Sequence, residues 1–200
     1  VLARRSMVIG ASFGLVSSVF LTLTGDGSAF YVAQKQPAKL AAMEGLYQGQ
    51  EGAGLVAVGL MNPGKQIGDD KKAFLFKIEI PKMLSMLGYR SADAFVPGAD
   101  DLVYGNPEQG IPSADEKMER GRIALQALAS YKEAVRSGDE QMAAASRALF
   151  DENYYYMGYG HLFNPEGIIP NVPFIFYSFR IMVILGFGFI ALFMLILYLS

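Results

Sequence analysis

Two long apolar runs lie near the ends of the chain, and a much longer polar stretch separates them. The first, Met7–Thr24, carries no charge and is about as long as a membrane-spanning helix, which needs roughly 20 residues. Its glycines and serines suit close packing against other membrane helices, although a buried core helix would give a similar pattern. The second, Phe174–Leu199, is more strongly apolar and carries one charge, Arg180. The pattern predicts a mainly α, integral membrane protein with two transmembrane helices.

The charges beside the first run predict its orientation. Arg4 and Arg5 precede it, and the enrichment of basic residues on the cytoplasmic side of membrane proteins places them in the cytoplasm. Gly25–Ser28 then predicts a turn on the outer side, because glycine and aspartate favour turns. The second helix returns inward, so the segment between them is one extracytoplasmic loop that is too long for a simple connector. The predicted division is a transmembrane helix at 1–24, the loop at 25–172 and a transmembrane helix at 173–200.

The loop is predicted to be mostly helical and irregular. Alternating apolar and polar residues within Ala73–Ile80 favour a short strand, which Pro81 ends, and a brief helical turn is expected at Met83–Leu87. Gln48–Gly54 is rich in glycine and is expected to be irregular. Phe95–Pro112 is rich in proline, glycine and aspartate and is expected to be a loop.

Two helices are predicted in the second half of the loop. Ser113–Glu116 is a capping box, which opens a helix to about Arg136. Ser137–Asp139 breaks this helix, and a second one runs over about Glu140–Phe150. One apolar stripe on the first helix is expected to pack in a core and not to bind a partner. Its members are Met118, Leu125, Leu128, Tyr131 and Val135.

Several tyrosines precede the second apolar run. Tyr154–Tyr156 and Tyr159 are expected to form the aromatic belt that membrane proteins place at the lipid interface, with a lipophilic pocket as the alternative. His161 is the single histidine of the chain, and we interpret it as a polar loop residue and not as a metal ligand.

Composition excludes several classes of function. The net charge of −2 gives no basic footprint for nucleic acid, and the absence of cysteine excludes disulfides, thiolate zinc sites and cysteine nucleophiles. No phosphate-binding glycine loop or serine nucleophile motif is present, so hydrolase and kinase functions have no support. The chain begins without methionine, and an acidic turn follows its first apolar run in place of a cleavage site. We therefore expect a piece of a larger membrane protein.

Gln36–Gly45 is the segment with the most suggestive chemistry. Pro37 and Gly45 bracket about two helical turns, because proline favours the first helical position and glycine the position after the end. Lys39 lies in the first turn and Glu44 at the last, the reverse of what the helix dipole favours. At roughly 100° per residue the two side chains point about 140° apart, with Gln36 between them. Two interpretations of these three side chains are open. They belong either to a solvated helix surface or to a site that surrounds a small polar ligand with a cation, an amide and a carboxylate.

A second candidate opens the last apolar run. Methionine thioether can be an axial haem ligand, and Met182 follows Arg180 about two turns inside the predicted helix. The alternatives are a methionine that fills a packing gap and an arginine whose charge reaches the membrane interface.

Together these segments closely resemble subunit I of the cytochrome bd quinol oxidases. The resemblance covers essentially the whole chain, and the Gln-x-x-Lys-Leu-Ala-Ala-x-Glu run is its most specific part. It implies the middle of that subunit, with its sixth span, its long periplasmic quinol-binding loop and its seventh span. The matching segments are Ala3–Ser6, Gly25-Asp26, Gln36–Glu44, Ile80-Pro81, Gly158–Gly160 and Phe179–Met182.

The resemblance implies a role for each matching residue. Lys39 and Glu44 match the two quinol-site residues of the family, and Gln36 a neighbouring polar position. Met182 matches the axial methionine of the low-spin haem b, known as b558, and Arg180 an arginine beside that haem. The histidine opposite the methionine, and the ligands of haem b595 and haem d, have no counterpart in this chain. The family also implies a partner subunit II and the rest of subunit I, in a bacterial inner membrane.

This role agrees with the chemistry of the residues. Quinol oxidation releases protons and electrons, so a carboxylate such as Glu44 suits the acceptor of a hydroxyl proton when burial raises its pKa. Lys39 suits a ring oxygen that gains negative charge. We therefore predict the quinol-oxidising segment of a respiratory terminal oxidase, a quinol:oxygen oxidoreductase that is inactive as this piece alone. The alternative is a two-span membrane sensor or receptor with an extracytoplasmic ligand-binding domain.

Overall fold

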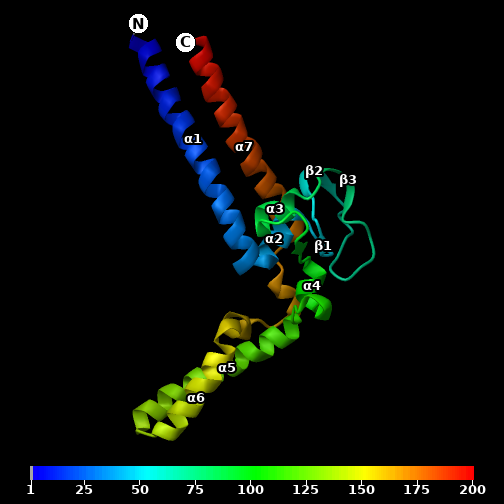
Figure 1. Cartoon of the computed structure of the whole chain (residues 1–200), viewed down its shortest axis with the longest axis vertical. Helices are drawn as coiled ribbons and strands as arrows, with labels where there is room; N and C mark the ends of the chain where they lie inside the picture. The colour runs from blue at the N-terminus through cyan, green and yellow to red at the C-terminus, as the bar shows by residue number, and fades with distance from the viewer. Residues whose placement is uncertain (1) are drawn as a thin grey trace.

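The computed structural model describes residues 2–200, with the exception of the Asp26 side chain, and is mainly helical (Figure 1). The predicted first span includes Val1, which lies outside the described residues. The α-helices are α1 (Leu2–Lys35), α2 (Pro37–Glu44), α3 (Met83–Tyr89), α4 (Ala99–Tyr104), α5 (Ala114–Ser137), α6 (Glu140–Asn153) and α7 (Val172–Leu199). The strands are β1 (Gln50–Glu51), β2 (Leu55–Met61), β3 (Phe74–Ile80) and β4 (Phe95–Val96). The 3₁₀ helices are η1 (Pro107–Gln109), η2 (Tyr154–His161) and η3 (Pro165–Ile168).

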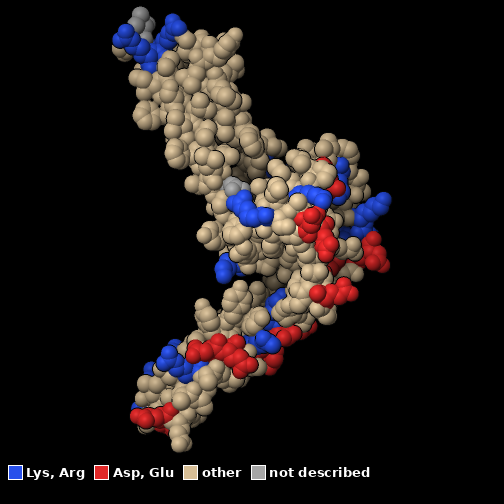
Figure 2. All heavy atoms as spheres, in the orientation of Figure 1, with Lys and Arg blue, Asp and Glu red and all other residues tan. Residues whose placement is uncertain are grey.

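Helices α1 and α7 lie side by side, with the two chain termini at the same end of the pair (Figure 1). Both are long and apolar enough to cross a membrane, as predicted, and Figure 2 shows almost no charge along them on the visible face below the N-terminal tip. They pack closely, because a Cβ atom on Gly14 would lie 2.5 Å from the Phe193 ring. The intervening chain therefore emerges from one end of the pair. The side of the membrane on which this end lies stays a prediction.

Helix α1 does not end where the sequence predicted. The expected turn at Gly25–Ser28 is wrong, since α1 continues as a helix to Lys35. The hydroxyl groups of Thr24 and Ser28 bond to backbone carbonyls one turn earlier, so these polar residues are satisfied within the helix. The helix stops at Gln36, because the residue before a proline is disfavoured in the helical conformation.

A small β hairpin lies beside the first turns of α7. The predicted strand at Ala73–Ile80 is confirmed as β3, which pairs antiparallel with β2. The backbone N–H of Met61, at the end of β2, donates to the Tyr177 hydroxyl of α7 at 3.0 Å. The predicted helical turn after Pro81 is α3, and the irregular Gln48–Gly54 segment contains only the short strand β1.

The prediction of a loop over Phe95–Pro112 is wrong. This segment holds β4, α4 and η1, and one partly buried carboxylate, which sequence spacing does not reveal, connects its parts. The Asp101 carboxylate accepts bonds from the backbone N–H groups of Gly98 and Gly49, at 2.9 and 2.8 Å, and from the Asn106 amide at 2.8 Å. Helix α4 then buries its apolar residues in the main core.

The main core joins α2, β2 and α4 to the start of α7. It therefore fixes the short helix α2 against the first turns of the long helix α7. Its buried members are Ala41, Ala42, Tyr47, Val56, Met61, Ala99, Leu102, Val103, Ile169, Val172 and Phe176.

Helices α5 and α6 form a hairpin that projects away from the two long helices (Figure 1). The predicted cap is confirmed, because the Ser113 hydroxyl accepts from the Glu116 N–H at 3.2 Å. The break is also confirmed, with Gly138 in the left-handed conformation and Asp139 capping α6. The predicted apolar stripe is only partly correct, since Met118 is buried but Val135 is 57% exposed. Small residues take most of the buried positions on α5: Ala114, Gly121, Ala124, Ala127 and Ala134.

The tyrosines lie along α5 and not beside α7. They belong to η2, which packs against α5, and the Arg120 guanidinium lies over the Tyr156 ring at 5.3 Å. Tyr154 contacts Phe150 of α6, with ring centres 5.9 Å apart. The predicted aromatic belt beside the second span is therefore wrong for these residues.

Close backbone packing between α5 and η2 gives a stability prediction. A Cβ atom on Gly121 would lie 2.3 Å from the Gly160 nitrogen and 2.5 Å from the Tyr156 carbonyl oxygen. We expect Gly121→Ala to destabilise this hairpin by about 1–3 kcal/mol, because backbone atoms must move to admit the methyl group. The measurement is the rate of limited proteolysis within the hairpin of the complete protein.

Gly158→Ala is the matched control. Gly158 lies in η2, the segment that packs against α5, but nothing lies within 4 Å of its added Cβ atom. Faster cleavage of the Gly121 variant alone supports the packing argument, and equal cleavage of the two variants contradicts it.

Candidate functional site

The candidate segment Gln36–Gly45 forms the two-turn helix that its sequence predicts. Pro37 is the first residue of α2, and Gly45 follows its end in the left-handed conformation, with φ of 64°. Glycine is required there for space as well, since an added Cβ atom would lie 2.8 Å from the Phe74 ring and 3.2 Å from Phe176. The end of α2 is therefore held directly against the hairpin and α7.

Glu44 is paired with an arginine that lies 136 positions later in the chain. One Arg180 nitrogen, Nη2, lies 2.7 Å from Glu44 Oε2, and the other, Nη1, lies 3.4 Å from Oε1. Both side chains are buried, and Glu44 is only 4% exposed. The predicted alternative, in which the Arg180 charge simply reaches the membrane interface, does not occur, because the guanidinium is buried against Glu44.

Arg180 also binds two backbone carbonyls. Its Nη2 donates to the Val56 oxygen of β2 at 2.6 Å, and its Nη1 donates to the Met43 oxygen at the end of α2. The guanidinium lies over the Phe176 ring at 4.2 Å. One side chain of α7 therefore connects α2, the hairpin and the long helix.

The environment of Glu44 acts on its proton affinity in two directions. Burial raises the pKa of the Glu44 carboxyl, because the charged form loses its hydration. The positive charge and hydrogen bonds of Arg180 oppose this rise without cancelling it. Glu44 is thus a buried carboxyl whose pKa lies above its ordinary value, outside the predicted span.

Lys39 and Gln36 lie elsewhere on α2. Both side chains are exposed, and the described residues include no hydrogen bond or ion pair for the Lys39 ammonium. The structure therefore brings Glu44 together with Arg180 and leaves Lys39 and Gln36 on the outer surface. This agrees with the separation of about 140° between Lys39 and Glu44 that the helical periodicity predicts.

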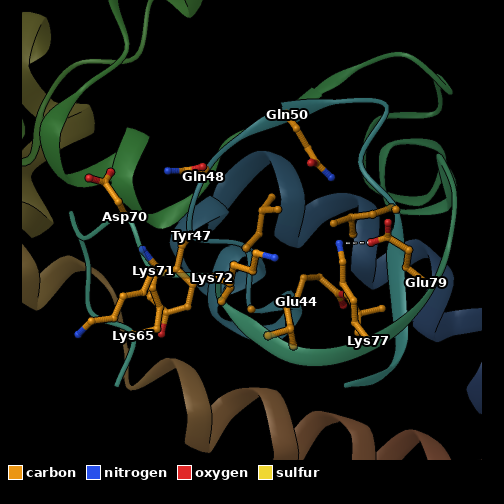
Figure 3. A pocket seen from close by; sticks show the side chains of 17 residues that line it. Glu44, Tyr47, Gln48, Gln50, Lys65, Asp70, Lys71, Lys72, Lys77 and Glu79 are labelled. Atoms are coloured by element: carbon orange, nitrogen blue, oxygen red, sulfur yellow. Dashed lines mark hydrogen bonds and ion pairs between the residues drawn. The ribbon is translucent and has the colours of Figure 1, made fainter. Parts of the chain in front are cut away.

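A cavity of about 290 Å³ opens beside Glu44, between the end of α2 and the hairpin (Figure 3). Its walls combine apolar side chains, among them Val56 and Phe74, with charged ones from the hairpin. Figure 3 shows the ion pair between Lys77 and Glu79, which both lie on β3. Glu44 is among the residues that line the same cavity. Sequence reasoning missed this cavity because its walls come from segments that are far apart along the chain.

Met182 lies two residues beyond Arg180 but points away from it, because residues two apart on a helix are separated by about 200°. Its side chain is 60% exposed on α7. The structure therefore does not bring Arg180 and Met182 to one point. His161 is exposed within η2, and residues 2–200 contain no group of three or more histidine, cysteine or acidic residues with the spacing of a metal site.

Comparison with known proteins gives a consistent result. The family model for cytochrome bd terminal oxidase subunit I matches residues 1–200. Cytochrome bd-II ubiquinol oxidase subunit 1 of Escherichia coli (strain K12) is 31% identical over 198 residues, which cover 90% of this chain and 35% of that protein. A Bacillus subtilis (strain 168) protein, provisionally named cytochrome bd menaquinol oxidase subunit I, is 30% identical over 95 residues, which cover 48% of this chain and 20% of that protein.

The chain thus spans about a third of the length of the Escherichia coli relative. The predicted family agrees with the match over the whole chain, and the alternative of a two-span sensor is not favoured. The chain belongs to the cytochrome bd terminal oxidase subunit I family.

Proposed function

We propose that this chain is the quinol-oxidising part of a cytochrome bd-type respiratory oxidase, which passes electrons from membrane quinol to haem and reduces oxygen to water. The observation that carries the proposal is the buried pair of Glu44 and Arg180. It fixes the end of the quinol-motif helix α2 to the helix that holds Met182. The proposed proton acceptor, Glu44, and the proposed haem ligand, Met182, then lie on elements that are directly connected.

The proposed reaction separates the products of quinol oxidation. A quinol loses two protons and two electrons and becomes a quinone. Glu44 as carboxylate accepts a hydroxyl proton, for which its raised pKa is suited. Lys39, with Gln36 beside it, offers donors to a ring oxygen at the exposed side of the same motif.

The residues of α7 could hold a haem together with a ligand from outside this chain. The Met182 side chain is exposed on α7, so its thioether could hold the iron of a haem that packs against this helix. We propose that this is the low-spin haem b558, whose other ligand belongs to the rest of subunit I. A haem b held there would supply a one-electron acceptor for the electrons that the quinol releases. Arg180 connects helix α7, which carries Met182, to the quinol motif through its ion pair with Glu44.

The long helices support the proposed membrane arrangement. Helix α1 has 34 residues, so at about 1.5 Å per residue it is roughly 50 Å long, against a hydrocarbon core of about 30 Å. Its last turns can therefore project beyond the bilayer with α2, which keeps the division into 1–24, 25–172 and 173–200 as our proposal. We place the 25–172 loop on the periplasmic side of a bacterial inner membrane.

The remaining parts of the enzyme lie outside this chain. We propose that the rest of subunit I and subunit II are its partners, that haem b595 and haem d reduce oxygen there, and that this piece alone is inactive. The short length of the match within the Escherichia coli relative supports this, since most of that protein has no counterpart here.

Replacement of Lys39 tests the proposal in the complete oxidase. We expect Lys39→Ala to lower the rate of quinol oxidation by about tenfold, because a charged donor to a ring oxygen contributes about 1.5–3 kcal/mol. Haem content, read from the redox difference spectrum, should stay near that of the wild type. Lys35→Ala is the matched control, since Lys35 is also exposed but lies at the end of α1. Wild-type rates in both variants contradict a role for Lys39.

A further inference from the structure

The β2–β3 hairpin has two unlike faces, and its charged residues lie on the inner one. Lys77 and Glu79 of β3 line the cavity beside Glu44, and they pair across the sheet with Gly59 and Val56 of β2. Residues directly opposite each other in an antiparallel pair share one face of the sheet. The face with the charges is therefore turned toward the cavity.

The other face of the hairpin is apolar and exposed. Its centre consists of two cross-strand pairs, Val58 with Ile78 and Leu60 with Phe76. Each of these four side chains, which we call the outer hairpin face, is more than half exposed, and none has a polar atom. Contiguous exposed apolar side chains mark sites that bind protein or membrane. This face therefore needs a partner that the described part of the chain does not supply.

Two contacts with α7 fix the direction of the hairpin. Arg180 Nη2 donates to the Val56 oxygen near the start of β2, at 2.6 Å. The Tyr177 hydroxyl accepts from the Met61 N–H at the end of β2, at 3.0 Å. Strand β2 therefore runs opposite to α7. Its charged connection to β3, residues 62–73, lies toward the beginning of that helix.

The same contacts place the hairpin near the end of the membrane span. The uncharged run Ile181–Leu199 is roughly 28 Å long at about 1.5 Å per residue, close to a hydrocarbon core of about 30 Å. The buried ion pair of Arg180 and Glu44 belongs outside that core, because charges within it are costly. Since Arg180 binds β2 directly, the hairpin starts at the level where α7 leaves the hydrocarbon.

The position and composition of the outer hairpin face favour lipid over protein. The hairpin lies beside α7, on the side away from α1 (Figure 1). Protein interfaces carry about one hydrogen bond per 100–200 Å², and closely packed membrane helices use small residues. The outer hairpin face offers neither polar groups nor small residues. Large apolar side chains alone suit acyl chains.

The free edge of the hairpin limits its depth. Strand β3 pairs with β2 alone among the described strands, so its other edge leaves backbone groups that the hydrocarbon core does not tolerate. Just after β3, Lys82 pairs with Asp93 at 2.5 Å, and these charges also require a polar surrounding. Interfacial segments bury an apolar face about 5–10 Å deep at the boundary between headgroups and acyl chains. That boundary satisfies both conditions.

We propose that the outer hairpin face rests on the membrane, at the boundary between headgroups and acyl chains of the leaflet in which α7 begins. The hairpin then anchors the 25–172 loop to lipid while its charged face closes the cavity beside Glu44. Lipid contact and not quinol turnover is the readout, so this anchor stands or falls independently of the proposed function.

A spin label at Phe76 tests the proposal. Phe76→Cys in the complete oxidase is labelled with a nitroxide and placed in nanodiscs of phosphatidylethanolamine and phosphatidylglycerol, without quinol so that oxygen is not consumed. The signal of the equally treated parent oxidase is subtracted. We expect the label to collide more often with oxygen, which concentrates in lipid, than with a water-soluble nickel chelate. More collisions with the chelate overturn the proposal, and so does protection from both reagents, which means that protein covers the face.

Phe163→Cys is the matched control. Phe163 is also an exposed aromatic residue, but it lies between η2 and η3, outside the hairpin. We expect its label to collide more often with the nickel chelate. If the labels at Phe76 and Phe163 give the same order, the hairpin has no special contact with lipid and the proposal is overturned.

The wild-type oxidase gives a test that needs no substitution. A phospholipid with a diazirine near the top of one acyl chain is added to the same nanodiscs and activated by light, and mass spectrometry locates the attached peptides. We expect attachment within 58–60 and 76–78 as well as along α7. Attachment to the long helices that spares both strands overturns the proposal.

Discussion

Glu44→Gln in the complete oxidase is expected to lower quinol turnover by about a hundredfold. Glutamine keeps the size of the side chain and one acceptor oxygen but cannot accept the quinol proton, and general base catalysis contributes about 10²–10⁴-fold. The measurement is steady-state quinol oxidation, with haem content read from the redox difference spectrum of the same sample. We expect haem content to stay near normal, because Glu44 lies on α2 and not on the Met182 face of α7.

The pH dependence of quinol oxidation gives a second test of the role of Glu44. Glu44 must be deprotonated to accept a proton, so activity falls as the pH falls through its pKa. Burial raises the pKa of Glu44, so this acid limb should lie above the ordinary glutamate value of about 4.3. Glu44→Gln removes the group that titrates, and its residual activity should lose this limb.

The control for Glu44→Gln must separate chemistry from stability. Glutamine leaves the buried Arg180 charge without its carboxylate, although the Val56 and Met43 carbonyls still accept its hydrogen bonds. Thermal unfolding of the complex measures this loss directly. Glu108→Gln is the matched control, because Glu108 is an exposed carboxylate of the same loop. Equal turnover of the two variants contradicts the role of Glu44 as proton acceptor.

Several elements could be predicted from the sequence because their signals are local. Pro37 and Gly45 bracket α2 within nine positions, and each favours its place for a backbone reason of its own. Ser113 and Asp139 cap α5 and α6 through side-chain bonds to N–H groups three residues later. The two apolar helices follow from composition alone.

The elements that the sequence did not predict depend on distant contacts. The order of Phe95–Pro112 comes partly from the bond between Asp101 and the Gly49 N–H, 52 positions away. The tyrosines of η2 were expected beside α7, but the close approach of Gly160 to Gly121 places them along α5. Neither contact leaves a periodic signal in the chain.

The candidate site also combines local features that the sequence predicts with distant contacts that it does not predict. The sequence pointed to Glu44 and Arg180 as separate features, and each is where its own segment predicts. Their ion pair, and the cavity beside it, exist only because the main core fixes α2 against α7. A sequence shows which residues have suitable chemistry, whereas packing decides which of them meet.

Met182→Leu is expected to abolish or strongly alter the low-spin haem b signal in the redox difference spectrum of the complete oxidase. Leucine matches methionine closely in volume and polarity, so the substitution should cost less than about 1.5 kcal/mol of stability. It removes the thioether sulphur, however, which is the only atom of this side chain that can bind iron. The loss should therefore be confined to the low-spin haem, with the signals of the other haems retained.

A second methionine of α7 supplies the control for that substitution. Met194 is also about half exposed on the same helix, and Met194→Leu should leave the spectrum unchanged, because it lies more than three turns further along α7. An unchanged low-spin signal in the Met182 variant would exclude this methionine as a ligand. Glu44 and Arg180 would then still connect α2 to α7, but the electron acceptor for the quinol would have to be held by residues outside this chain.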